Sequence, residues 1–379
     1  MYRVSQQELF ERDQKWGGAV VGWRLRRARK SAGFSLRALG NRIGLTHAAI
    51  KRYEDEGVNP SSSVVAKLAD ALGVCPTYFF LPQKITLQAV KYRTRYRLSK
   101  KRLEAIQWDI ISQVEERIDL ERLFPSVPII PFSLPLRLPK RITALRDIEQ
   151  VTYKIRQYWA LGLVDIMHFV DILESHGIRV ITTHMDETSY KKFDGLTAWI
   201  GQTPIIVVDR NWPGDHQRFT LAYELGHLIL ANRLDPAVDE ELACHYFAGA
   251  FLLPSQPAKQ ILGTYRKHIE LSELMLIKKK FGISMMATLY RAKALEILPV
   301  SAFNRQLRQF KINGWHIQEP GDAYPVETTQ FFEQLVFRAL GEGYIDENKA
   351  AALIKVPIDE LRYMRTFEKH HSDCMSLPC

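Results

Sequence analysis

The sequence has no run of 18 consecutive apolar residues, and its first residues contain no apolar segment of the kind found in signal peptides. These absences argue against a membrane-spanning or exported protein, and we expect a cytoplasmic location. Cysteine is also scarce. The four cysteines form no CxxC pair and no zinc-ribbon spacing, so we expect buried or incidental thiols rather than a disulfide framework. They are Cys75, Cys244, Cys374 and Cys379.

Positive charge is concentrated at one end of the chain. The 379 residues carry a net charge of +10, and their length predicts two to four domains. Residues 1–102 contain 21 Lys and Arg against 7 Asp and Glu, whereas the rest contains 31 against 35. A basic segment on a slightly acidic body is typical of a polyanion-binding module, because neutralised phosphates release condensed counterions. Charge alone leaves a solvated basic surface as an equal alternative.

Two short helices joined by a tight turn are legible in the basic segment. Ser35 is a natural N-cap for a helix over 36–43, which Gly44 ends. Thr46 is the next N-cap, for a helix over 47–54. This pairing is the helix-turn-helix signature, in which the second helix enters the major groove of DNA.

Further helices are expected on both sides of this motif, over 19–30 and 64–72, with a last short one ending near Phe80. The runs SLRALGNRIGLTHAAIKRYEDEG and PSSSVVAKLADALGV resemble the phage-repressor-like (Cro/C1, or XRE) family of DNA-binding regulators. Gly40 stands where that family more often has Ala, a departure that leaves the expected fold intact. The resemblance implies a helix-turn-helix domain over residues 1–83.

Ile50 and Tyr53 are expected to face inward on the recognition helix, which presents its other residues to double-stranded operator DNA. We assign His47, Ala48 and Arg52 to base edges, since Arg pairs with guanine and Ala meets a thymine methyl. The alternative for each is an ordinary solvated side chain. A module of this size reads a short half-site, which implies a homodimer. The other predicted DNA-binding residues, most of them phosphate contacts, are Arg37, Asn41, Thr46 and Lys51.

Residues 84–139 are expected to connect two domains. The basic residues over 91–102, with Tyr92 and Tyr96, are candidates to extend the nucleic-acid surface. An amphipathic helix is predicted over 99–123, either as a dimerisation or docking element or as a helix packed on its own domain. The run PSVPIIPFSLPLRLP carries five prolines and predicts an extended linker.

The runs RFTLAYELGHLIL at 218–230 and EELACHYFAGAFLLP at 240–254 carry the chemistry of the second half. In a helical His-Glu-x-x-His motif, two imidazoles on one face hold zinc and the Glu activates the bound water. The region over 140–300 resembles the ImmA/IrrE family of metallopeptidases, which implies an α+β, zincin-like domain. The resemblance places Glu224 at the general base, His227 at the second zinc ligand and Glu241 at the third.

Tyr223 stands where that family has its first histidine ligand. Tyrosine is a poor zinc ligand near neutral pH, because its phenol must lose a proton with a pKa of about 10. Three interpretations stay open. The site is degenerate and the fold serves as a sensor; or the site is rebuilt from His227, Glu241 and His245; or Tyr223 ligates, or another metal replaces zinc.

Residues 301–379 are expected to form a C-terminal helical subdomain. The predicted fold is therefore mainly α with a small β-sheet. We expect a sequence-specific transcriptional regulator, a repressor whose peptidase-like body responds to a protein partner or a small molecule, with no membrane partner. Antitoxin-like, stress or phage-related roles are implied by the resemblance alone. The alternative is an active zinc-dependent endopeptidase that cleaves a repressor or itself.

Overall fold

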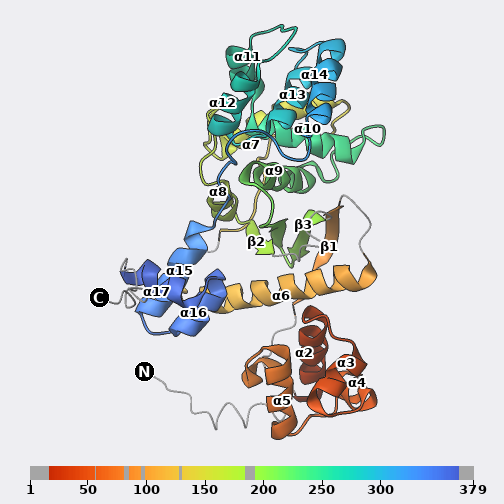
Figure 1. The fold of residues 1–379 in the computed structure, drawn as a ribbon, viewed down its shortest axis with the longest axis vertical. Helices are drawn as coiled ribbons and strands as arrows, with labels where there is room; N and C mark the ends of the chain where they lie inside the picture. Colours follow the sequence, from red (N-terminus) through yellow and green to blue (C-terminus); the bar gives the residue numbers. More distant parts are fainter. Residues whose placement is uncertain are drawn as a thin grey trace, which may run out of the picture. The chain divides into compact units, whose positions relative to one another are not determined.

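The computed structural model describes residues 17–55, 57–80, 85–94, 99–127, 130–183 and 193–366 (Figure 1). Tyr96, Cys374 and Cys379 lie outside these residues. The described chain is mainly helical with one four-stranded sheet, which confirms the predicted fold class. It divides into two compact units, Met1–Gln88 with Thr94–Glu115, and Ala89–Arg93 with Glu116–Cys379. None of the described helices is long and apolar enough to cross a membrane.

The first unit is a set of short helices around one small core. The predicted caps are confirmed: the Ser35 hydroxyl accepts the Ala38 N–H at 3.0 Å, and the Thr46 hydroxyl accepts the Ala49 N–H at 3.2 Å. Gly44 ends its helix in the left-handed conformation, with φ of 74°. The helices are α2 (Gly17–Ser31), α3 (Leu36–Ile43), α4 (His47–Asp55), α5 (Ser62–Leu72), the 3₁₀ helix η2 (Pro76–Phe80) and the first part of α6 (Lys100–Arg122).

The first part of α6 packs on α2. Of the two roles predicted for this helix, its first part therefore has that of a helix packed on its own domain. The rings of Trp23 and Trp108 meet edge to face with centroids 5.8 Å apart. The guanidinium groups of Arg24 and Arg27 are both buried and both pair with Glu115. A buried carboxylate is stable only when cations neutralise it, so these pairs fix which face of α6 meets α2.

A second buried ion pair joins α2 to the recognition helix α4. Arg29 donates to both carboxylate oxygens of Glu54, at 2.6 and 2.7 Å. The two helices also approach closely at Gly22, where a Cβ atom would lie 2.4 Å from the Tyr53 carbonyl oxygen. Only glycine allows this approach without a shift of the backbone.

The second unit is built around a sheet with the strand order β1-β3-β4-β2. β2 pairs parallel with β4, and β3 pairs antiparallel with β4 through a turn at Gly201. β3 and β4 are buried along most of their length. The strand β1, in the connector, was not predicted. The bounds are β1 (Gln88–Thr94), β2 (Arg179–Thr183), β3 (Phe193–Ile200) and β4 (Thr203–Asp209).

The helices of the second unit form two cores. The larger core extends along the chain from Leu138 to Phe310, and a smaller one joins α15, α16 and α17 to Leu120 and Phe124. The helices are α7 (Ile148–Tyr158), α8 (Phe169–Ser175), α9 (Gly214–Leu230), α10 (Glu240–Leu252), α11 (Ser255–Leu262), α12 (Leu271–Phe281), α13 (Met285–Ala294), α14 (Val300–Ile312), α15 (Gln330–Gly341), α16 (Glu347–Ile354) and α17 (Ile358–Thr366).

One predicted helix start was wrong. The sequence from residue 144 onward has a helical pattern and Thr143 before it is a candidate N-cap, which predicts a helix that begins at residue 144, but α7 begins at Ile148 after a short 3₁₀ turn. The reason is Asp147, whose carboxylate accepts the backbone N–H groups of Thr143 and Ala144 at 3.1 and 2.9 Å. These bonds hold the chain before Ile148 in a turn.

The close approach of α2 and α4 predicts that Gly22→Ala destabilises the first unit. Overpacking of this kind costs about 1–3 kcal/mol, because the added methyl meets backbone rather than a flexible side chain. Thermal unfolding of the full chain is the measurement. Gly341→Ala, in α15, is the matched control: its Cβ meets nothing within 4 Å, so it is expected to be neutral or stabilising. Equal unfolding midpoints for the two variants would contradict the packing described.

Candidate functional site

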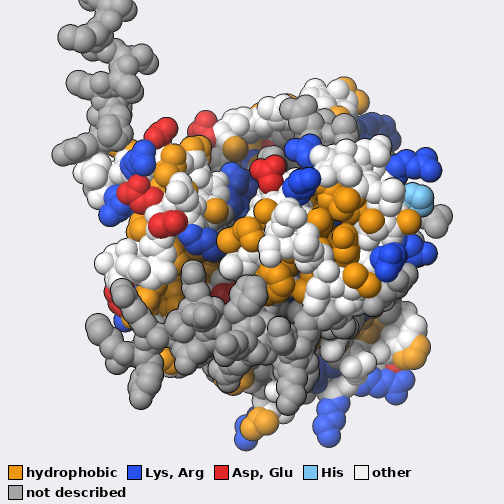
Figure 2. Space-filling view, turned by 90° about the horizontal axis from the view of Figure 1, so that it is seen from below, with side chains coloured by type: hydrophobic (Ala, Val, Ile, Leu, Met, Phe, Trp, Pro, Cys, Tyr) orange, Lys and Arg blue, Asp and Glu red, His pale blue; other side chains and the backbone are white. Residues whose placement is uncertain are grey.

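Helix α4 exposes the residues expected to read DNA. Ile50 is fully buried and Tyr53 is half-buried, so this face anchors the helix to the core. In the space-filling view of Figure 2, Lys and Arg side chains are spread over the face shown, with hydrophobic side chains between them. The predicted contact residues are all exposed: Arg37, Asn41, Thr46, His47, Ala48, Lys51 and Arg52.

The turn before α4 is tighter than the sequence indicated. A Cβ atom on Gly40 would lie 2.5 Å from the Leu45 carbonyl oxygen and 3.3 Å from the His47 nitrogen. Gly40 is therefore needed for the close packing of α3 against the turn, which sets the position at which α4 begins.

In the second unit, α9 and α10 carry the predicted metallopeptidase-like residues. The helices cross at Gly226, where a Cβ atom would lie 3.3 Å from the Phe247 ring and 3.4 Å from the Cys244 backbone. This close crossing brings the side chains of α9 near those of α10. Nearly every residue of α9 is buried, so it is a core helix beside the sheet.

Tyr223 contacts the three residues that were expected as metal ligands. The Tyr223 hydroxyl donates a short hydrogen bond to Glu241, and its ring lies 5.0 Å from the His227 ring and 4.8 Å from the His245 ring. Burial raises the pKa of Tyr223 and Glu241 adds to the effect, so the phenol keeps its proton and acts as a donor. Desolvation and, next, the charge of Arg93 lower the pKa of His245 to about 4, so His245 is neutral near pH 7.

Glu224, at the position of the general base, is 1% exposed and lies against β3. Thr197 donates to its Oε2 at 2.5 Å, whereas its Oε1 has no hydrogen-bond partner among the described residues. Gly195 allows the strand to approach this closely, because a Cβ there would lie 2.8 Å from a Thr220 methyl. Burial raises the pKa of Glu224 to about 8.

Arg93, on β1, completes the site and was missed by the sequence analysis. Its guanidinium lies 4.4 Å from the centre of the Tyr223 ring, donates to the Thr220 hydroxyl at 2.8 Å and lies 3.6 Å from Asp194. Lys91, two residues earlier, pairs with Glu240. The basic connector was expected to extend the nucleic-acid surface, but these two residues bind the peptidase-like body. Basic residues at alternate positions, Lys91 and Arg93, were the sequence signal that could have predicted a strand here.

These side chains do not fit a zinc ion. Three of the ligand types His, Cys, Asp and Glu must converge on one point, and no such group exists among the residues that the structure describes. The Tyr223 hydroxyl and Glu241 bond to each other, and His227 Nδ1 lies 3.0 Å from Glu240 Oε1. A fixed cation, Arg93, stands over the Tyr223 ring. We assign no hydrolytic step to this arrangement.

Two protein-family models match the chain, one in each of its two units. Residues 20–77 match a helix-turn-helix domain. Residues 173–293 match the IrrE N-terminal-like domain of the peptidase M78 family. No curated protein is significantly similar to the chain. The chain is thus a fusion of a helix-turn-helix domain with an IrrE N-terminal-like domain, as both resemblances indicated.

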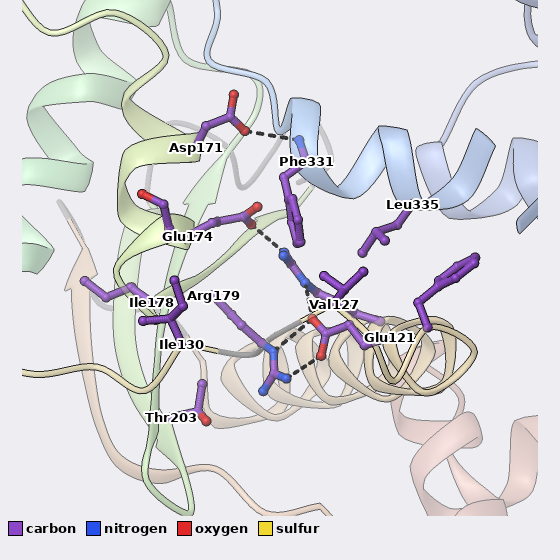
Figure 3. A pocket seen from close by; sticks show the side chains of 14 residues that line it. Glu121, Val127, Ile130, Asp171, Glu174, Ile178, Arg179, Thr203, Phe331 and Leu335 are labelled. Atoms are coloured by element: carbon purple, nitrogen blue, oxygen red, sulfur yellow. Dashed lines mark hydrogen bonds and ion pairs between the residues drawn. The ribbon is translucent and has the colours of Figure 1, made fainter. Parts of the chain in front are cut away.

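A separate cavity of about 390 Å³ opens in the second unit, away from Glu224 (Figure 3). Apolar side chains of α15, together with Phe124, Val127 and Ile130, face a set of ion pairs. Arg117 bonds to Glu174, and Arg179 bonds to Glu121. Each arginine of the cavity is already neutralised by a carboxylate, so the cavity offers mainly an apolar surface.

The raised pKa of Glu224 predicts a pH dependence of stability. Its folded-state value of about 8 exceeds the usual 4.5, so the folded chain holds a proton that the unfolded chain releases. Stability therefore falls as pH rises from 4.5 to 8, and Glu224→Gln removes this contribution. Unfolding midpoints at pH 5 and pH 8 are the measurement. Glu342→Gln, at the exposed residue that follows α15, is the control. An equal pH slope in Glu224→Gln and wild type would contradict the assignment.

Proposed function

We propose that this chain is a sequence-specific transcriptional regulator that binds operator DNA as a homodimer and represses its own or a neighbouring gene. The observation that carries the proposal is the surface of α4. Its apolar face is locked into the core by Ile50, and its opposite face presents His47, Ala48 and Arg52 to solvent. Such a helix enters the major groove with its first residues at the base edges.

The ion pairs of the first unit support this role. Arg29 and Glu54 fix the far end of α4 against α2, so the recognition helix is held rigidly. A rigid helix loses little conformational entropy when it binds, and this favours affinity. A homodimer follows from the short half-site that one such helix reads, because two half-sites supply the needed specificity.

The peptidase-like body, in this proposal, signals rather than cleaves. The support is chemical. Tyr223 stands where the family has a histidine ligand. Its hydroxyl keeps its proton and donates a hydrogen bond to Glu241. Glu224, with its pKa raised to about 8 by burial, is mostly protonated near neutral pH, and a protonated carboxyl group is no general base. These features weigh against the competing function, a metal-dependent endopeptidase.

Substitutions on α4 test the DNA-binding proposal. Operator sequences are first selected from a random duplex library with the full chain, and a two-fold-symmetric site is expected. Arg52→Ala should then cost about 1–3 kcal/mol and relax specificity at one position, as expected for a base contact. Lys51→Ala should weaken binding to all sequences and lower the salt slope by about 1, as expected for a phosphate contact.

Lys67→Ala is the matched control, because Lys67 is exposed on α5, away from the recognition helix. It is expected to leave operator affinity unchanged. Selection of no sequence at all, or equal losses for Arg52→Ala and Lys67→Ala, would refute the proposed role of α4.

A further inference from the structure

The strand β1 occupies one edge of the sheet, and it comes from the connector. The strand order places β1 beside β3, which in turn carries Asp194 and Thr197 of the site (Figure 1). Residues Ala89–Arg93 belong to the second unit, but the chain on both sides of them belongs to the first. The body therefore holds a short piece of the segment that leads to and from the DNA-binding unit.

Opposite charges attach this strand to the site. Lys91 and Arg93 are two residues apart, so they project to the same face of the strand. Lys91 pairs with Glu240, which also contacts His227. Arg93 lies on the Tyr223 ring and beside Asp194. The body's side of the contact is acidic: Asp194 and Glu240 pair with Arg93 and Lys91, and Glu241 lies beside them on the Tyr223 hydroxyl, whereas Glu224 is mostly protonated.

The attachment is weaker than that of the other strands. None of the described β1 side chains is buried, whereas β4 is buried from Pro204 to Asp209. The Lys91–Glu240 pair is nearly half exposed on both sides, and such pairs contribute about 0–1 kcal/mol. Ala89 adopts a left-handed φ of 49°, a conformation unfavourable for a residue other than glycine. A competing strand without this backbone strain would pair with β3 more favourably than β1 does.

We propose that the edge of β3 beside Tyr223 is a binding site for an extended segment of a partner protein with basic residues at alternate positions, and that β1 fills it until the partner displaces it. Main-chain pairing to a sheet edge provides affinity, and the acidic side chains select a basic strand. Displacement frees both flanks of β1, which belong to the DNA-binding unit. The inference rests on the proposed function, since it supplies the signal to which the regulator responds.

A fluorescent peptide with the sequence LQAVKYRT, residues 87–94, tests the site. The receptor is the full chain, as wild type and as Lys91→Glu/Arg93→Glu, in which the charges of its own β1 are reversed. The variant is expected to bind the peptide at least about tenfold more tightly, which corresponds to about 1.4 kcal/mol. A peptide with Glu at both basic positions should not bind either chain. Lys279→Glu/Lys280→Glu, with the same charge change on exposed residues of α12, should behave as wild type.

A milder variant, Lys91→Ala/Arg93→Ala, guards against misfolding and should show a smaller gain in affinity, provided that it melts cooperatively. Affinity for operator DNA is measured on the same samples, with and without the peptide. Saturating LQAVKYRT is expected to change the operator affinity of Lys91→Ala/Arg93→Ala at least about threefold, which corresponds to about 0.7 kcal/mol.

Each contrary outcome has a separate meaning. If the peptide binds no better to either β1 variant than to wild type, or if the charge-reversed peptide binds as well, the partner site is overturned. If wild type dimerises through β1 and the variants become monomers that ignore the peptide, the edge serves self-assembly, and the proposal is again overturned. If wild type selects no operator, the proposed function fails whatever the peptide does.

Discussion

The hydrogen bond from Tyr223 to Glu241 is the contact around which the peptidase-like body is arranged. It joins α9 to α10 beside His227 and His245. Its geometry depends on the close crossing at Gly226 and on a phenol that keeps its proton. Arg93 adds a positive charge over the same ring, and its cation–π contact contributes about 0.5–2 kcal/mol. The Tyr223 hydroxyl proton thus stabilises the Glu241 carboxylate, and the Arg93 guanidinium stabilises the Asp194 carboxylate.

Arginine–carboxylate pairs organise the DNA-binding unit in a similar way. Glu54 fixes α4 to α2 through Arg29, and Glu115 fixes α6 to α2 through two buried arginines. Removing one partner of such a pair leaves a buried charge uncompensated, which costs about 3–5 kcal/mol. α2 is therefore the helix to which both the recognition helix and the first part of α6 are attached. A change in the first part of α6 therefore has a physical route, through α2, to α4.

Local signals made most of the fold predictable. Ser35, Gly44 and Thr46 act within a few residues of themselves, so the helix boundaries around the turn were read correctly. The grouping of Tyr223 with His227 was predictable because residues four apart share a helix face. Arg93 was not, because its position depends on a strand that pairs with β3 far along the chain. The wrong start of α7 has a related cause: a side chain after the expected cap competed for the same backbone groups.

Metal content tests most directly the proposal that the Tyr223 hydroxyl and Arg93 occupy this site and that no metal ion binds there. Wild type and His227→Ala are purified as full chains, incubated with excess zinc, desalted and analysed for zinc and other transition metals. We predict far less than one metal ion per chain in both proteins. A near-stoichiometric metal in wild type that His227→Ala removes would contradict it, and would indicate a site rebuilt around His227, Glu241 and His245.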